Sequence, residues 1–205
     1  MIKTPLYIKL LNYDFEKLFK EKGYKYFTKG IYNLNIIGVR ATKGDIITNK
    51  YDDYIVVLYN TPSGPQRKIF TCTTEPGLYY MYHFMNPAGT AILAPGQYVG
   101  CWHIAKHRGK YQALCQKKAV TVYRDTNKDD KYDLDPRKKD TGVFGINIHR
   151  ASQWSETKTI DKYSAGCQVL NNPSQFNSFM YLCRKQAELY GNSFTYTLVN
   201  EKDLK

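Results

Sequence analysis

Residues 145–170 read GINIHRASQWSETKTIDKYSAGCQVL, and our prediction of the fold and of the candidate site starts from them. An alternating apolar run, VFGINIH at 143–149, predicts a strand that ends at His149. A polar stretch follows, and Ser164-Ala165-Gly166 then precedes Cys167 and another apolar run. The pattern therefore places one histidine on a strand and one cysteine beside a glycine-containing turn.

Apolar runs on both sides of this stretch predict further strands. Three of these runs lie nearer the N-terminus, at LNIIGVRA (34–41), DYIVVLYNT (53–61) and RKIFTCTTE (67–75). Residues 91–125 supply about three more strands, because Pro95-Gly96 and Arg108-Gly109 interrupt the pattern. The run SFTYTLV (193–199) predicts the last strand.

Two segments have the apolar spacing of helices instead. Residues 13–22 include a candidate N-cap, Asp14, and end before Gly23. Residues 172–191 begin at Asn172, continue through a proline in the first turn, and have one apolar face before a glycine.

The order of these elements predicts a mainly β fold with packed helices, in the α+β class. A chain of 205 residues suits one domain, and 42% hydrophobic residues suffice for a substantial core. The 19 tyrosines also favour strands and half-buried surfaces. We expect residues 1–23 to form a helical extension packed on a single domain at 24–205.

The formal net charge of +12 predicts association with polyanions such as nucleic acid, anionic lipid or an acidic cell-wall polymer. The basic residues are scattered, and no nucleic-acid-binding motif accompanies them, so no specific nucleic-acid partner is expected. No stretch approaches the length of a membrane span, and the N-terminus lacks the pattern of a signal peptide. We expect synthesis in the cytoplasm.

The five cysteines are odd in number and widely spaced, which predicts neither a disulfide framework nor a zinc ribbon. Cys72 and Cys115 lie in apolar runs and Cys183 lies on the apolar face of the C-terminal helix, so these thiols are expected in the core.

His149 and Cys167 are the candidate catalytic pair. A thiol becomes a useful nucleophile when an imidazole takes its proton and backbone N–H groups hold the developing oxyanion. Gly166 allows a tight turn and a close approach of a carbonyl substrate, and the N–H of Cys167 is the natural first oxyanion donor. Ser164 is a candidate either for fixing the loop or for a hydrogen bond near the site. A nearby His and Cys also occur by chance, so spacing alone leaves an ordinary loop as the alternative.

IHRASQWSETKTIDKYSAGCQV (148–169) resembles the catalytic motif of L,D-transpeptidases of the YkuD type, in which a His and a spacer precede Ser/Thr-x-Gly-Cys. FTCTTEPGLYYM (70–81) is similar to the strand that leads into the substrate cleft of that family. The resemblance covers roughly residues 24–199 and is strongest to lysin-like members of phages.

The resemblance implies an L,D-transpeptidase-like β-sandwich or barrel and a cysteine enzyme that acts on bacterial peptidoglycan. It implies that His149 deprotonates Cys167, that the N–H groups of Cys167 and Gly166 hold the oxyanion, and that the carbonyl of Arg150 orients the imidazole. A thioester forms, and no metal or organic cofactor is required.

Two departures from the family pattern bear on substrate binding. Arg150 follows the histidine where the family usually has glycine, and its charge is either a cleft feature or a plain surface charge. Val169 stands where the family often has Arg or Asn, and Asn171 follows two positions on as a candidate substrate contact. His107 and Tyr111 are candidates from the segment HRGKY, which is otherwise a polar hairpin.

Two possible metal sites are less favoured. His83, His103 and His107 could meet at zinc only if their segment were helical, and its residues favour a strand and a turn. RDTNKDDKYDLD (124–135) resembles a calcium loop, but it lacks the glycine at position six and the glutamate at position twelve. A turn in which Asp and Asn cap their own backbone is the favoured interpretation.

The favoured function is a cell-wall lysin, a stem-peptide hydrolase that is made without a signal peptide. It reaches peptidoglycan after release from the cytoplasm or as part of a virion, where virion proteins would be partners. The alternatives are an L,D-transpeptidase that forms cross-links or exchanges D-amino acids, and a non-catalytic wall-binding or virion structural module. Anionic wall polymers suit the basic surface.

Overall fold

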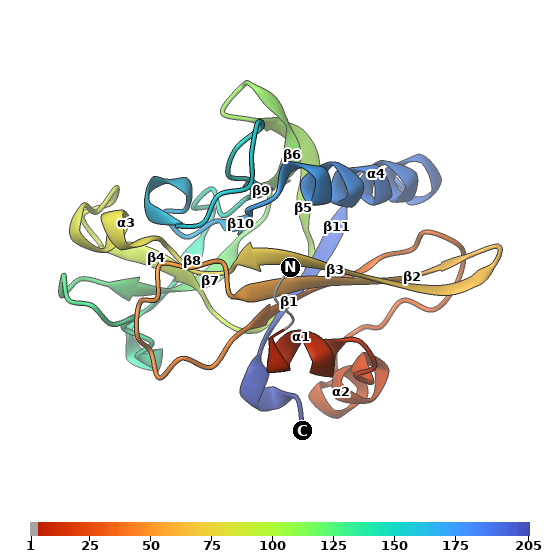
Figure 1. Cartoon of the computed structure of the whole chain (residues 1–205), viewed down its shortest axis with the longest axis horizontal. Helices are drawn as coiled ribbons and strands as arrows, with labels where there is room; N and C mark the ends of the chain where they lie inside the picture. The colour runs from red at the N-terminus through yellow and green to blue at the C-terminus, as the bar shows by residue number, and fades with distance from the viewer. Residues whose placement is uncertain (1–3) are drawn as a thin grey trace.

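The computed structural model describes residues 4–205. The fold is mainly β, as predicted: eight strands close into a barrel and three form a small separate sheet (Figure 1). Around the barrel the order is β1, β11, β5, β6, β9, β10, β3, β2, and the small sheet has the order β4, β7, β8. Two barrel pairs, β1 with β11 and β9 with β10, are parallel, and the others are antiparallel.

The elements of the structure have the following bounds. The barrel strands are β1 (Asn35–Arg40), β2 (Asp53–Thr61), β3 (Gly64–Thr73), β5 (Gly96–His107), β6 (Tyr111–Gln116), β9 (Ile148–Arg150), β10 (Gln168–Leu170) and β11 (Phe194–Asn200). The small sheet consists of β4 (Thr90–Leu93), β7 (Val120–Asp125) and β8 (Lys139–Gly142). The α-helices are α1 (Pro5–Leu10), α2 (Phe15–Lys22), α3 (Leu78–Tyr82) and α4 (Pro173–Tyr190). The short 3-10 turns are η1 (Pro136–Lys138), η2 (Asp161–Tyr163) and η3 (Glu201–Asp203).

Strand β1 is buried along its whole length because both of its faces are covered. Ile36 belongs to the main core, whereas Ile37 and Val39 pack with residues of α1 and α2 on the other face. A strand covered on both faces needs apolar residues at successive positions, which explains the run NIIGV. Figure 1 shows α1 and α2 on one side of the barrel and α4 on the other.

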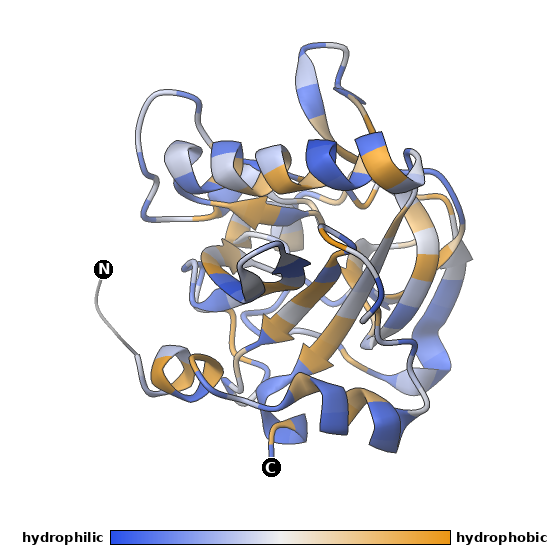
Figure 2. Ribbon diagram, turned by 90° about the vertical axis from the view of Figure 1, so that its right-hand side faces the viewer, coloured by the Kyte–Doolittle hydropathy of each residue, from blue (hydrophilic) through white to orange (hydrophobic). Residues whose placement is uncertain are grey.

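Helix α4 has the caps that the sequence predicts. The Asn172 side chain accepts hydrogen bonds from two main-chain N–H groups of the first turn, and Gly191 follows the last turn with a φ of 84°. Its apolar face joins the main core through Phe176, Phe179 and other buried side chains. Figure 2 shows hydrophobic and hydrophilic residues in alternating bands along the helix ribbons. The packing of α4 covers β3, β9 and β10, and His149 of the candidate site lies in β9.

The structure differs from the sequence prediction in several short elements. Residues 91–125 contain parts of four strands rather than three, since a break without glycine or proline at 117–119 separates β6 from β7. The predicted strand at 143–149 is confined to β9, and Gly145 has a φ of 75° just before it. Within residues 4–205, no helix is both long and apolar enough to cross a membrane.

Candidate functional site

The parallel pairing of β9 and β10 brings His149 and Cys167 to one face of the barrel wall. Val169 pairs with His149, so Cys167, two residues before Val169, lies next to Asn147, two residues before His149. Side chains two residues apart on a strand point to the same face. His149 and Cys167, which are 18 positions apart in the chain, therefore line the same cavity.

The half-buried thiol of Cys167 is held by main-chain groups. Its Sγ lies 3.4 Å from the Gly145 carbonyl, to which it donates, and 3.5 Å from the Asn147 N–H, from which it accepts. Burial raises the pKa of this thiol to about 11 in spite of the Asn147 N–H and the positive Arg108, which lower it. The Cys167 thiol is therefore neutral near pH 7.

The imidazole of His149 is buried and fixed by its Nδ1 atom. Nδ1 lies 2.8 Å from the Arg150 carbonyl, which is the contact that the family resemblance implies. The Tyr111 hydroxyl donates to the same carbonyl at 3.2 Å and so holds it in place. A carbonyl can only accept, so Nδ1 carries the proton and Nε2 is left as a free base.

A second imidazole lies against the first. The rings of His107 and His149 stack with centroids 4.2 Å apart, and His107 Nδ1 lies 3.0 Å from the Asn147 side-chain nitrogen. Burial first, and then His107, lowers the pKa of His149 to about 3. Burial and Arg108 also lower the pKa of His107. Both rings are therefore neutral near pH 7, as a base that must accept a proton has to be.

The cavity in front of the pair has a volume of about 450 Å³. Its lining comes from α3 and the segment after it, the small sheet, the β5–β6 turn, β9 and the segments before β9 and β10, and it contains no acidic side chain. Arg108 and Arg124 supply positive charge, although Arg124 is paired with Asp140 at 2.9 Å. Aromatic and apolar groups supply much of the remaining wall, namely Tyr80, Met85, Val143, Phe144, Ile146 and Tyr163.

The turn before Cys167 has little room to vary. Gly166 has a φ of 120°, and a Cβ there would lie 2.3 Å from the Ala91 carbonyl oxygen, so only glycine fits. The buried Ser164 hydroxyl donates to the Cys167 carbonyl at 2.8 Å and accepts from the Gly166 N–H at 3.2 Å. Ser164 thus fixes the loop. The Gly166 N–H is engaged here, which leaves the Cys167 N–H as the oxyanion donor that the loop offers.

Of the residues predicted to bind substrate, His107 lines the cavity and two others do not. The Tyr111 hydroxyl donates to the Arg150 carbonyl, and the Arg150 guanidinium carbon lies 4.2 Å from the centre of the Tyr111 ring. Asn171 donates to Glu156 and to the Thr157 carbonyl, so it anchors the loop between β9 and β10. The Arg150 side chain is likewise taken up by aromatic rings outside the cavity.

Asn147 is a site residue that the sequence reasoning missed, and Arg108 belongs to the segment HRGKY but was not singled out as a site residue. Asn147 contacts Cys167 through its main chain and His107 through its side chain. Its position two residues before His149 on an alternating run was the available signal. Arg108 follows His107 in the β5–β6 turn and lines the cavity, but only the closed barrel brings that turn to Cys167.

The candidate zinc and calcium residues are not gathered into metal sites in the described part of the chain. His103 and His107 both lie in β5, where a separation of four residues is about 13 Å. The Asp125 and Asp129 side chains accept from the Asp133 and Lys131 N–H groups, which confirms the predicted capping turn. Among residues 4–205, no group of three or more His, Cys, Asp or Glu side chains is arranged to hold a metal ion.

All five cysteines are free thiols. Cys72 and Cys183 are fully buried, as predicted, whereas Cys115 is only partly buried on β6. A scan against protein-family models and searches of curated proteins and of solved structures found no match for this chain. Its function is therefore inferred from its own residues.

Proposed function

We propose that the chain is a cysteine-dependent hydrolase of peptidoglycan stem peptides built on an L,D-transpeptidase-like barrel. The observation that carries the proposal is the placement of His149 and Cys167 on one face of two neighbouring parallel strands, beside one cavity. The Arg150 carbonyl fixes His149 Nδ1, so that Nε2 is the free base. A thiol with a raised pKa requires a base of this kind.

In the proposed mechanism His149 Nε2 takes the proton from Cys167 as the sulfur bonds to a peptide carbonyl carbon. The carbonyl oxygen becomes an oxyanion, which the Cys167 N–H stabilises. The resulting imidazolium returns its proton to the departing amine, the C–N bond breaks, and a thioester remains. Water, deprotonated by His149, then releases the acid and regenerates the thiol.

The charge of the cavity suits a substrate that bears carboxylates. The lining contains Arg108 and Arg124 and no acidic side chain, while aromatic groups offer apolar contact to short side chains. Stem peptides combine carboxylates with small aliphatic side chains, which fits both features. The net charge of +12 also supports attraction to anionic wall polymers.

Hydrolysis and acyl transfer share every step up to the thioester. We place hydrolysis first because Cys167 is only half-buried, so water can reach a thioester formed on it. Transfer to a D-amino acid or to a second stem is the alternative resolution of the same intermediate.

Incubation with muropeptides of defined stem composition is expected to yield products that have gained one water per event. Mass spectrometry of the products, with and without a supplied D-amino acid, makes the measurement. Products dominated by exchange or by new cross-links would identify a transpeptidase. An unchanged stem with tight wall binding retained would identify a non-catalytic wall-binding module.

EDTA is expected to leave the same activity unchanged, whereas iodoacetamide abolishes it, because the proposed steps use only a thiol, an imidazole and main-chain N–H groups. Activity is assayed after chelation and after adding back zinc or calcium separately. Rescue by zinc would implicate the histidines. Rescue by calcium alone would implicate the turn that contains Asp125 and Asp129.

A further inference from the structure

The buried side chain of Gln168 holds the peptide group that joins Gly166 to Cys167. Gln168 is fully buried, and its amide nitrogen donates to the Gly166 carbonyl at 3.3 Å and to the Thr74 carbonyl at 3.4 Å. The Tyr196 hydroxyl donates to the amide oxygen at 2.9 Å. This third contact fixes which end of the amide faces the two carbonyls.

The orientation of this peptide determines where the Cys167 N–H points. A peptide group is planar and, in the trans form, its C=O and N–H bonds point in opposite directions. No cis peptide occurs among residues 4–205, and no protein group in that range accepts a hydrogen bond from the Cys167 N–H. Holding the Gly166 oxygen against Gln168 therefore turns the Cys167 N–H away from Gln168, free to receive an oxyanion.

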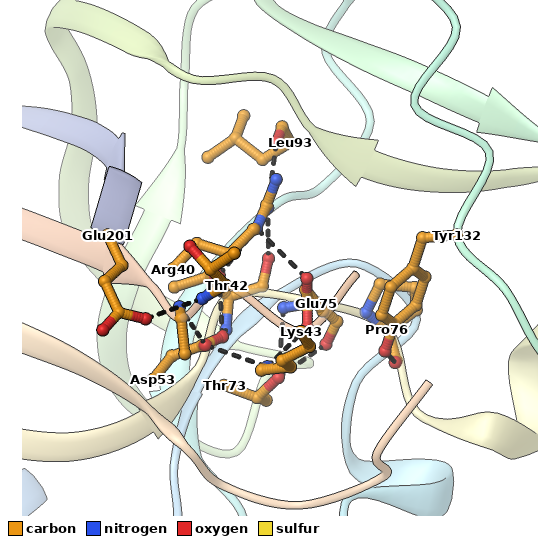
Figure 3. A network of polar contacts seen from close by, with 12 residues as sticks. Arg40, Thr42, Lys43, Asp53, Thr73, Glu75, Pro76, Leu93, Tyr132 and Glu201 are labelled. Carbon is orange, nitrogen blue, oxygen red and sulfur yellow. Dashed lines mark hydrogen bonds and ion pairs between the residues drawn. The ribbon is translucent and has the colours of Figure 1, made fainter. Parts of the chain in front are cut away.

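The carbonyl of Thr74 that shares the Gln168 amide is itself rigidly held. Arg40 donates to the Thr74 carbonyl at 2.8 Å and to the Thr74 hydroxyl at 3.0 Å. The same guanidinium donates to the Leu93 carbonyl at 3.0 Å, and Asp53 accepts from the Thr74 hydroxyl at 2.8 Å. Figure 3 shows Arg40 and Asp53 within this buried network. The network therefore holds in place the Thr74 carbonyl, to which the Gln168 amide donates.

We propose that Gln168 is a positioning residue that aims the Cys167 N–H at the oxyanion of the acylation step. The inference rests on the proposed thioester chemistry and adds a residue that touches neither the substrate nor the reacting atoms. Loss of a well-placed oxyanion donor lowers kcat by about 10²–10³-fold. Misdirecting one donor, rather than deleting it, is expected to cost about tenfold or more.

The test compares two reactions of the same thiol in the Gln168→Met variant, which removes both polar atoms at similar volume. Acetylation by p-nitrophenyl acetate passes through a tetrahedral oxyanion: the sulfur bonds to the acetyl carbon, p-nitrophenolate leaves, and the thiol proton passes to His149. Alkylation by iodoacetamide displaces iodide directly and forms no oxyanion. We expect acetylation of Cys167 to slow by at least about tenfold and alkylation to change by less than about twofold.

Gln186→Met is the matched control, because Gln186 is a buried glutamine that bridges the Leu34 N–H and the Ser193 carbonyl. It is expected to lose comparable stability while keeping the ratio of the two rates. Gln168→Glu adds a pH readout. A buried carboxylic acid donates to the Gly166 carbonyl, and its ionisation removes that donor as pH rises from about 6 to about 9. In Gln168→Glu, the ratio of the acetylation rate to the alkylation rate is therefore expected to fall over that range, whereas the same ratio in the wild type stays constant.

Equal slowing of both reactions, or an unchanged ratio in Gln168→Met and in Gln168→Glu at high pH, would overturn the positioning role. If Gln168→Met fails to fold, the pH dependence of Gln168→Glu decides alone. The proposed function fails separately, when the wild-type thiol is acetylated but no muropeptide is turned over. A wild-type thiol that is alkylated but never acetylated would overturn both.

Discussion

Replacement of Cys167 by alanine is expected to abolish turnover of muropeptides, and replacement of His149 by alanine to lower kcat by about 10²–10⁴-fold. The first change removes the nucleophile. The second leaves a thiol whose pKa lies near 11 without its base. Rates are measured by product mass, and thermal unfolding of each variant confirms that it folds. Cys115→Ala is the control, since it removes a partly exposed thiol on β6.

Labelling with iodoacetamide tests the same pair without any substrate. Cys167 is expected to react before Cys72 and Cys183, which are fully buried, and before Cys115, because His149 is the proposed base of Cys167 alone. Peptide mass spectrometry locates the label. Preferential reaction at another cysteine, or an unchanged Cys167 rate in His149→Ala, would exclude the pair.

The pH dependence of kcat/KM follows from the lowered pKa of His149. An imidazole with a pKa of about 3 stays unprotonated at pH values well below 6.5, the usual pKa of histidine. The acid limb of the profile is therefore expected below pH 6.5. The pKa of the Cys167 thiol is shifted in the opposite direction, to about 11. Because the thiolate is the reactive form, alkylation of Cys167 is expected to accelerate steadily as pH rises towards about 11. An acid limb centred at 6.5 would contradict the burial of the base.

Much of the fold follows from local pattern. The alternating or continuous apolar runs of β1, β2 and β3, and the caps of α4, are short-range features that tertiary packing reinforces. The three-residue strands β9 and β10 are too short to have a period of their own. Their parallel pairing depends on the closure of the barrel, which no local pattern encodes.

Some residues of the candidate site could likewise be predicted from local sequence, and others could not. His149, Cys167 and the turn glycine lie in one segment, so a motif could identify them. Gln168 could not be assigned a role, because its direction depends on the register of β10 against β9 and β3. The polar network behind it joins residues from four separate segments, and a charged residue at a strand end ordinarily indicates a solvated surface.

Asp53 belongs to this buried polar network, and Asp53→Ala is expected to destabilise the fold by about 3–5 kcal/mol. Asp53 is fully buried and lies 3.0 Å from Lys43 Nζ, which also contacts Asp52 and Glu75 (Figure 3). It accepts from the main-chain N–H of Thr74 at 2.7 Å as well. Its removal leaves the buried N–H and hydroxyl donors of Thr74 without this acceptor. It also removes a negative charge that offsets the positive charges of Lys43 and Arg40.

Urea denaturation followed by tryptophan fluorescence measures this loss, since Trp102 is fully buried in the core. Glu188→Gln is the control, because Glu188 forms an exposed ion pair with Lys185 on the surface of α4. Such a pair contributes about 0–1 kcal/mol. A loss in Asp53→Ala no larger than that of the control would show that the network does not stabilise the fold.

The isosteric variant Asp53→Asn separates charge from shape through pH. Burial, and then the Asp53 charge, raises the pKa of Glu75 from 4.5 to about 7. Between these values the folded protein binds a proton that the unfolded chain releases, so wild-type stability falls as pH rises from 4.5 to 7. Without the Asp53 charge the pKa of Glu75 drops and this slope shrinks. The destabilisation by Asp53→Asn is therefore expected to be largest near pH 4.5 and to narrow towards pH 7. A constant difference across that window would show that the two carboxyl groups do not interact.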